Sequence, residues 1–134
     1  MQQKPRKINM YLVKPDETLA PEEGWVKMVL RWLIDEKTAG STMGTLGYTI
    51  FPPGGKHELH VHENAEEFII IKSGHGKGSC GDFTYECGPG DVIFIPKGAP
   101  HYIENASNVD LLELLFIYVG APSLEKSGYK PIKT

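Results

Sequence analysis

Three histidines and one glutamate have the residue types and spacing of a metal site. His60 and His62 are two residues apart, Glu67 follows five residues after His62, and His101 lies in a separate segment. Because residues i and i+2 of a β-strand point to the same side, His60 and His62 can present both imidazoles to one ion. Glu67 would open the neighbouring strand and complete a facial set of two histidines and one carboxylate, to which His101 adds a third imidazole. These residues therefore predict a site for one divalent transition metal ion: iron, manganese, nickel or zinc.

Neighbouring polar residues offer alternatives to this ligand set. Glu66 is the rival carboxylate, but it would face the opposite side of the strand from Glu67, which favours Glu67. His57 precedes His60 by three residues, so on a regular strand it would face away from the site and lie at the surface. Asn105 is expected to hydrogen-bond the backbone at the end of a strand, and not the metal.

Two longer segments contain the four candidate ligands. Residues 54–74 resemble the first cupin motif, G-x5-H-x-H-x4-E-x6-G, with Gly54, His60, His62, Glu67 and Gly74 in place. Residues 90–105 resemble the second cupin motif, G-x5-P-x-G-x2-H-x3-N, with Gly90, Pro96, Gly98, His101 and Asn105 in place. The chain is therefore similar to the cupin superfamily, and in particular to its small single-barrel members. The resemblance implies a jelly-roll barrel, metal ligands at the four residues above and a substrate pocket at the metal.

The hydrophobic pattern agrees with that fold. Apolar and polar residues alternate along most of the chain, and glycine and proline interrupt the pattern, which predicts an all-β protein of about ten short strands. We expect residues 1–20 to form an N-terminal arm, residues 21–120 a single cupin-type jelly-roll β-barrel (a double-stranded β-helix), and residues 121–134 a C-terminal tail. Residues 25–34 are expected to form one strand and residues 35–41 a loop.

The last expected strand, residues 111–119, is apolar on both faces apart from Glu113. An outer barrel strand usually shows a polar side to water, so something should cover its outer face. Two interpretations remain open. Either the N-terminal arm folds over the strand, or a second copy of the chain packs there in a homodimer, including one with exchanged arms.

Composition narrows the partners and the compartment. The chain has 134 residues with 14 Lys and Arg against 17 Asp and Glu, and no block of like charge that would suit nucleic acid or an anionic membrane. It also has no apolar run long enough to span a membrane and no secretory leader pattern. Cys80 and Cys87 would lie about 13 Å apart along one hairpin, too far for a disulfide. Two free thiols favour a reducing compartment, and we expect a cytoplasmic protein.

The chemistry of the predicted site favours a small substrate. Four protein ligands leave two adjacent positions on an octahedral ion, and three neutral imidazoles with one carboxylate leave a formal charge of about +1, which favours oxygen-rich ligands. The pocket walls are expected at Ile69, Ile71 and Ile103, followed by Tyr48, Ile93 and Phe94.

Two groups are candidates for moving protons in that pocket. They are Glu58, which has the strand parity of His60, and Tyr48. The resemblance implies a metal-dependent dioxygenase, isomerase, decarboxylase or lyase. The alternative is a non-catalytic cupin that binds or senses a small molecule.

Overall fold

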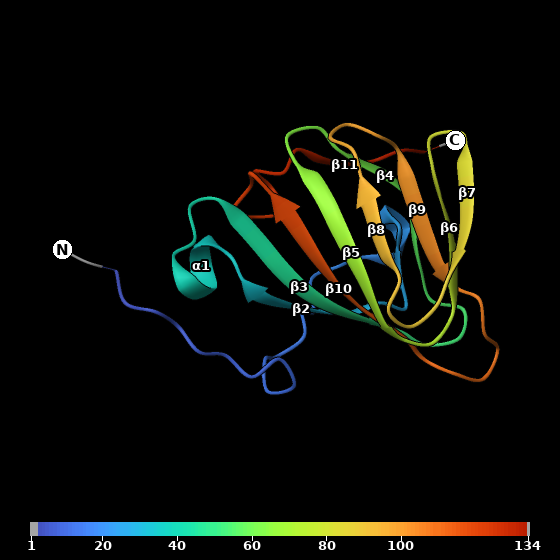
Figure 1. The fold of residues 1–134 in the computed structure, drawn as a ribbon, viewed down its shortest axis with the longest axis horizontal. Coiled ribbons are helices and arrows are strands. Elements are labelled where there is room, and N and C mark those ends of the chain that lie inside the picture. Colours follow the sequence, from blue (N-terminus) through green and yellow to red (C-terminus); the bar gives the residue numbers. More distant parts are fainter. Residues whose placement is uncertain (1–2, 134) are drawn as a thin grey trace.

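The computed structural model describes residues 3–133, which form two antiparallel β-sheets that face each other (Figure 1). Sheet I contains, in spatial order, β1 (Trp25–Val26), β4 (Lys56–His62), β9 (His101–Asn105), β6 (Gly76–Cys80) and β7 (Phe83–Cys87), and β11 (Tyr129–Pro131) also pairs with β4. Sheet II contains β2 (Val29–Ile34), β3 (Gly44–Phe51), β10 (Leu112–Val119), β5 (Glu66–Ser73) and β8 (Val92–Ile95). A 3-10 turn, η1 (Pro21–Glu23), and a short helix, α1 (Glu36–Ala39), complete the elements. The prediction of an all-β jelly-roll barrel is confirmed.

The hydrophobic core lies between the sheets, because alternate residues of each strand point inward. On β10 the inward residues are Leu112, Leu114, Phe116 and Tyr118, all of them buried. The Phe116 ring lies over Gly47 of β3, where a Cβ atom would come within 2.0 Å of the ring. Only glycine therefore allows this ring to pack across the neighbouring strand.

A β-bulge in β4 changes which of its residues face the barrel interior. His57 pairs with Ile103 and His60 pairs with His101, so three steps along β4 oppose two steps along β9. The extra residue breaks the strict alternation of a regular strand, and His57 and His60 both point inward. The expectation that His57 lies at the surface is therefore wrong.

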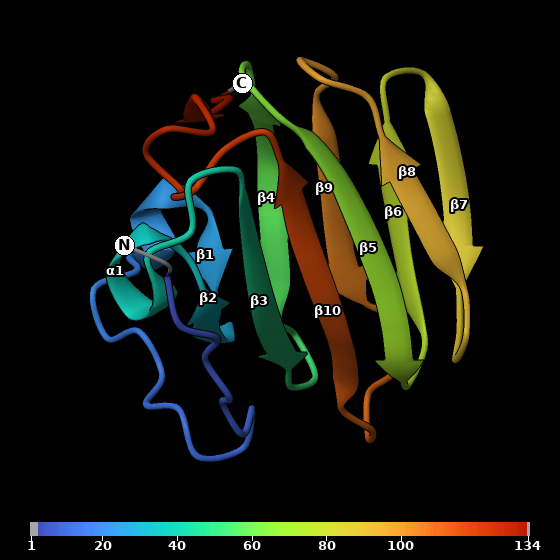
Figure 2. The ribbon, with the colours of Figure 1, turned by 60° about the vertical axis from the view of Figure 1, so that its left-hand side comes forward.

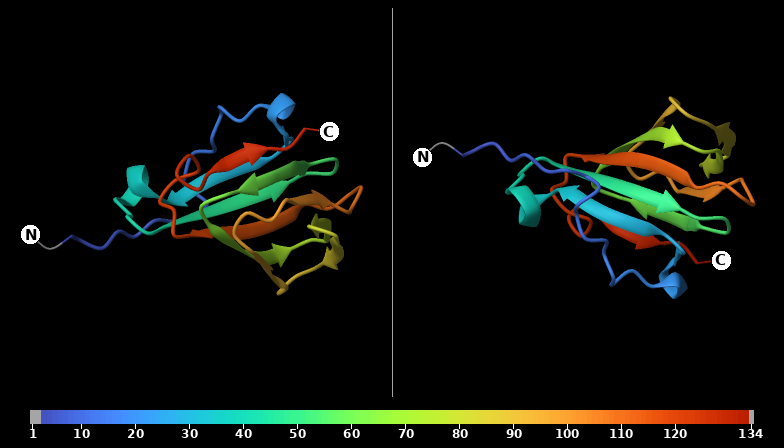
Figure 3. Two further views of the ribbon diagram at one scale, coloured as in Figure 1. Left: turned by 90° about the horizontal axis from the view of Figure 1, so that it is seen from above. Right: turned by 90° about the horizontal axis from the view of Figure 1, so that it is seen from below.

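The two ends of the chain pack differently. The N-terminal arm is largely exposed up to Leu12 and projects beyond the sheets in both views of Figure 3. Later residues of the arm are hydrogen-bonded to β2. Arg31 Nε donates to the Val13 carbonyl at 2.9 Å, and Trp32 Nε1 donates to Asp16 at 2.8 Å. The C-terminal tail is an integral part of the barrel, because β11 adds to the edge of β4.

Two local expectations need correction. The segment expected as one strand is divided into β1 and β2 around Lys27, whose φ of 55° interrupts the extended backbone. The expected polar loop contains α1, which begins with a capping box. Asp35 accepts from the amides of Lys37 and Thr38, and the Thr38 hydroxyl accepts from the Asp35 amide.

Cys80 and Cys87 lie in one hairpin, as predicted. In this β6–β7 hairpin Cys80 is opposite Phe83 and Cys87 is opposite Gly76, and both cysteines are free thiols. Among the described residues no helix is long and apolar enough to cross a membrane.

Candidate metal centre

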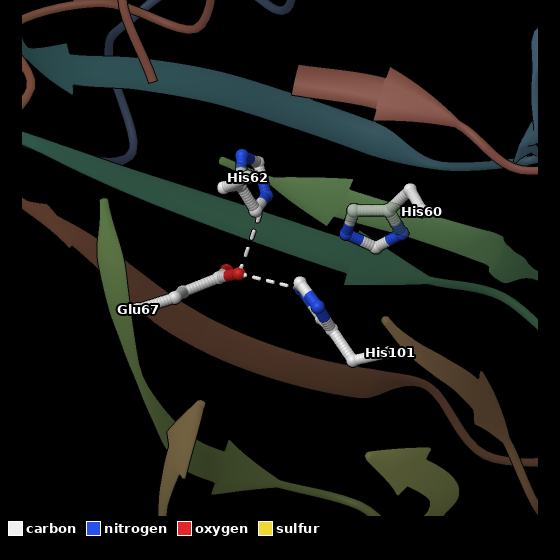
Figure 4. A group of neighbouring side chains, drawn as sticks. All are labelled: His60, His62, Glu67 and His101. Atoms are coloured by element: carbon white, nitrogen blue, oxygen red, sulfur yellow. Dashed lines mark hydrogen bonds and ion pairs between the residues drawn. The ribbon is translucent and has the colours of Figure 1, made fainter. Parts of the chain in front are cut away.

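The four predicted ligands meet inside the barrel. His60 and His62 come from β4 and His101 from β9 in sheet I, whereas Glu67 reaches across from β5 in sheet II (Figure 4). One ligand atom from each residue lies within 4.8 Å of the others. All four residues are at least nine-tenths buried. The barrel thus holds three imidazoles and one carboxylate around a common centre, and Glu67, not its neighbour Glu66, supplies the carboxylate.

Hydrogen bonds at the Nδ1 atoms orient all three rings. His60 Nδ1 donates to the Glu58 carbonyl at 2.7 Å, and His101 Nδ1 donates to the Ala99 carbonyl at 2.9 Å. The Ser127 hydroxyl donates to the Leu124 carbonyl at 2.5 Å and so accepts from His62 Nδ1 at 2.9 Å. Carbonyl oxygens can only accept, so each Nδ1 carries a hydrogen. Nε2 is then the ring atom that would bind a metal, in His101 after loss of the second hydrogen, which it donates to Glu67.

The Nε2 atoms face the carboxylate of Glu67. His62 Nε2 is buried, lies 3.4 Å from Glu67 Oε1 and has no hydrogen-bond partner among the described residues. His101 Nε2 donates to the same oxygen at 2.9 Å. Leaving a buried nitrogen unpaired costs roughly 1–3 kcal/mol, so the arrangement calls for a partner at the centre. A divalent transition metal fits this donor set of imidazole nitrogen and carboxylate oxygen.

The electrostatics of the site favour neutral imidazoles at two of the three positions. Burial lowers the pKa of His62 to about 4, and burial with the nearby histidines holds the pKa of His60 well below its usual range. Burial also lowers the pKa of His101, but the hydrogen bond and charge of Glu67 outweigh it, so the net shift is upward. A metal ion that binds His101 must therefore displace one proton.

A small cavity of about 20 Å³ adjoins the ligands. That volume admits roughly one water-sized group. Apart from the ligands, its walls are mostly aromatic and aliphatic, including Trp25, Phe51, Phe116 and Tyr118. Ile69 and Ile103 line it as predicted, whereas Ile71 belongs to the core beyond it. No lysine or arginine is among the described residues that line the cavity.

The two expected proton-transfer residues lie elsewhere. Tyr48 is on the outer side of β3, where its hydroxyl donates to Glu113, because Thr49 and Phe51 take the inward positions of that strand. Glu58 lies at the β4 bulge, exposed to solvent and 3.7 Å from Lys56 Nζ. The structure therefore places neither residue in the cavity, and the expectation that they share the ligand side is corrected. Phe94, another expected wall residue, is also on the outside, with 54% exposure.

A fourth buried histidine, His57, lies beside the ligands in the cavity, where Glu58 and Tyr48 were expected. The ring of His57 stacks on His60 with centroids 3.6 Å apart and on Trp25 at 4.0 Å. Its Nε2 atom lies 3.2 Å from the Tyr129 hydroxyl. His57 lines the cavity without belonging to the ligand set. The inward position of His57 could not be predicted, because no sequence pattern near it indicates the bulge. Tyr129 and Ser127 were missed because they reach the site from the C-terminal tail.

The expected role of Asn105 is supported. Its side-chain amide donates to the Phe51 and Asp110 carbonyls at 2.9 and 2.8 Å, so it fixes backbone and does not reach the cluster.

Comparisons with known proteins agree with this geometry. The family model for the cupin domain matches residues 47–118. An uncharacterized protein of Methanocaldococcus jannaschii, MJ1618, is 34% identical over 90 residues, which cover 67% of this chain and 72% of that protein.

Two solved structures have similar folds. The polyketide cyclase RemF from Streptomyces resistomycificus superposes with a TM-score of 0.76 at 24% identity, covering 98% of this chain and 87% of that one. The oxalate decarboxylase of Lactobacillus farciminis, in a formate complex, superposes with a TM-score of 0.70 at 28% identity. The match covers 85% of this chain but only 32% of the decarboxylase chain. With both motifs, the barrel and the buried ligand cluster in place, this chain belongs to the cupin family.

Proposed function

We propose that this protein is a metal-dependent enzyme that acts on a small, oxygen-rich substrate at the cluster of His60, His62, Glu67 and His101. The observation that carries the proposal is the buried, unpaired Nε2 atom of His62, which faces Glu67 beside two further imidazoles. Three of the four ligands have their second ring nitrogen hydrogen-bonded, which is typical of metal-binding histidines. A divalent ion bound there would act as a Lewis acid on substrate oxygen atoms.

The lining of the cavity would match a substrate with one polar end and an apolar remainder, and because the cavity holds only about one water-sized group, its walls must move apart for such a substrate to enter. The polar groups of the cavity are those of the ligand cluster together with His57 and Thr49, and its other walls are apolar. Because no cation lines the cavity among the described residues, a substrate with a single oxygen-rich group is better matched than a dianion such as oxalate. An enolate, a hydroxy acid or a phenolate has that form. A substrate that filled the cavity would displace water from it, which would strengthen the interactions of its oxygen atoms with the cluster.

His57 is the residue of this cavity that we expect to contact the substrate. Its ring is held between Trp25 and His60, and the Tyr129 hydroxyl holds its Nε2 atom. Burial holds the pKa of His57 well below its usual range. The imidazole is therefore neutral and can donate or accept a hydrogen bond with the substrate. The substitution His57→Phe keeps an aromatic ring in the stack and removes both nitrogen atoms. It should retain the metal and lose turnover.

The first test is metal content. Untagged protein purified without added metal should contain about one equivalent of a transition metal by plasma mass spectrometry, and His62→Ala should contain much less. A wild type that holds no metal, and takes up none on reconstitution with iron, manganese, nickel or zinc, would contradict the proposal.

The second test is turnover of a panel of hydroxy acids, β-dicarbonyl compounds, catechols and oxalate, followed by product analysis and an oxygen electrode. Turnover with oxygen uptake and both oxygen atoms of dioxygen in the product assigns a dioxygenase, and turnover without oxygen uptake assigns a lyase, decarboxylase or isomerase. Either activity should disappear in the apoprotein and in His62→Ala. A ligand that binds to the metal-loaded protein and is recovered unchanged would identify a binding or sensing protein instead.

A further inference from the structure

Two buried threonines lie on the inward side of β3, and their hydroxyl groups differ in their surroundings. Thr45 and Thr49 are four residues apart, so both side chains point between the sheets, and each residue is 1% exposed. The Thr45 hydroxyl donates to the Ala121 carbonyl at 2.9 Å. The Thr49 hydroxyl has no hydrogen-bond partner among the described residues. Thr49 lines the cavity at the ligand cluster, whereas Thr45 does not.

The neighbours of Thr49 in the sheet offer its hydroxyl nothing to bind. Thr49 lies between Leu30 of β2 and Leu114 of β10, and both leucines are buried. Figure 2 shows these three strands side by side in sheet II, with β4 of sheet I behind them. A buried hydroxyl without a partner destabilises a fold, and valine would fill the same space without that cost. The threonine is therefore better explained by a group that enters the cavity than by packing.

The strand register places Thr49 at the end of the cavity away from the ligand cluster. Glu67 lies opposite Tyr118 of β10, whereas Thr49 lies opposite Leu114, four residues earlier on the same strand. Four residues of a β-strand span about 13 Å. Outside the ligand cluster, the described residues that line the cavity carry no charge. Because an unpaired charge is costly in such surroundings, the group that fits beside Thr49 is an uncharged one.

We propose that Thr49 is a second anchoring point for the substrate, where its hydroxyl hydrogen-bonds an uncharged hydroxyl or carbonyl oxygen at the far end of the molecule. The inference rests on the proposed function, because the ligand cluster binds the oxygen-rich end. The substrate class is then an apolar body on the order of 10 Å long, with oxygen at both ends. A buried hydroxyl that only the correct substrate satisfies also discriminates against analogues that lack the distal oxygen.

The first test asks whether the fold itself uses the Thr49 hydroxyl, and it is made on the apoprotein. Thr49→Val keeps the shape of the side chain, and Thr45→Val is the matched control on the same side of the same strand. Thr45→Val should lower the melting temperature by several degrees, because the Ala121 carbonyl loses this donor. Thr49→Val should keep or raise the melting temperature. Equal losses in the two variants overturn the proposal, because the Thr49 hydroxyl would then serve the fold.

The second test is calorimetric titration of the metal-loaded protein with cinnamate and with 4-hydroxycinnamate. The two acids share the carboxylate end and differ only in the distal hydroxyl. Wild type should bind 4-hydroxycinnamate about tenfold more tightly, which is the effect of one hydrogen bond to a buried group. Thr49→Val should lose this preference and keep the affinity of wild type for cinnamate. Thr45→Val should keep the preference.

The outcomes separate this proposal from the proposed function. Equal affinities of wild type for the two acids, no binding of either acid at millimolar concentration, or a preference that survives in Thr49→Val each overturn the role of Thr49. Metal uptake without a preference for the distal hydroxyl refutes the Thr49 proposal alone. A wild type that takes up no metal refutes the proposed function and, with it, this substrate class.

Discussion

At the scale of single residues, the site depends on hydrogen bonds that lie behind the ligands. His60 and His101 are oriented by backbone carbonyls, which no substitution removes, but His62 is oriented by the Ser127 side chain. Ser127 is fully buried, and its hydroxyl in turn donates a hydrogen bond to the Leu124 carbonyl. The candidate metal site is therefore linked to the C-terminal tail through one hydroxyl group.

Ser127→Ala should weaken metal binding about tenfold or more, because His62 loses the acceptor that fixes its ring and tautomer. The measurement is a competition titration of the apoprotein with a chelator of known affinity. Ser123→Ala is the matched control, since the Ser123 hydroxyl accepts from the Lys126 amide in the same turn and touches no imidazole. Equal affinities for Ser127→Ala and wild type would show that the tail does not orient the ligand.

At the scale of elements, the pairing of strands decides which side chains reach the interior. The bulge in β4 turns His57 toward the barrel interior. The alternation along β3 places Tyr48 on the outer face of sheet II, where its hydroxyl donates to Glu113 of β10. Tyr48 therefore contributes to stability on the outer side of sheet II. Its own pKa is raised, by burial first and then by the hydrogen bond to Glu113.

This outer cluster predicts a dependence of stability on pH. The Tyr48 hydrogen bond, with smaller effects of Ser73 and Lys72, lowers the pKa of Glu113 below its ordinary value of 4.5 although burial opposes the shift. A carboxyl with a depressed pKa in the folded state stabilises the protein above about pH 4.5, and the contribution is lost as the pH falls through the folded-state pKa. Glu113→Gln should therefore lose less unfolding free energy than wild type between pH 5 and pH 3, by about 1 kcal/mol in urea titrations. If the free energy of unfolding of wild type and of Glu113→Gln fell equally between pH 5 and pH 3, the stabilising role of the Glu113 carboxylate would be contradicted.

The crossing of Phe116 over β3 gives a second prediction at this scale. Gly47→Ala should lower the free energy of unfolding by about 1–3 kcal/mol, because the new methyl group overlaps the Phe116 ring and the core must shift. Gly44→Ala on the same strand is the control, since its nearest neighbour would be 3.3 Å away. Denaturant titration of both variants should show the larger loss at Gly47. Equal losses would mean that the ring moves aside freely.

At the scale of the whole molecule, the ligands connect the two sheets, because three come from sheet I and Glu67 comes from sheet II. An ion bound only by the folded state adds its binding free energy to stability. Removing the metal with a chelator should therefore lower the melting temperature of wild type, and a metal concentration of 100 times its dissociation constant corresponds to about 2.7 kcal/mol. Differential scanning calorimetry of wild type and His62→Ala measures the effect. The chelator should leave His62→Ala unchanged, and a wild type that does not respond would show that the cluster binds no metal of consequence.

The fold class and the four residues of the buried cluster could be predicted from the amino-acid sequence alone. Both follow from local patterns, since alternation with a period of two depends on neighbouring residues and the H-x-H spacing places two imidazoles on one side of a strand. The surroundings of that cluster depend on strand pairing between distant parts of the chain, so the sequence alone did not show them. A bulge adds one residue to β4, and therefore reverses the expected sides of His57 and Glu58. Ser127 and Tyr129 join the site through pairing of the tail with β4, a contact between residues more than 60 positions apart that no local pattern encodes.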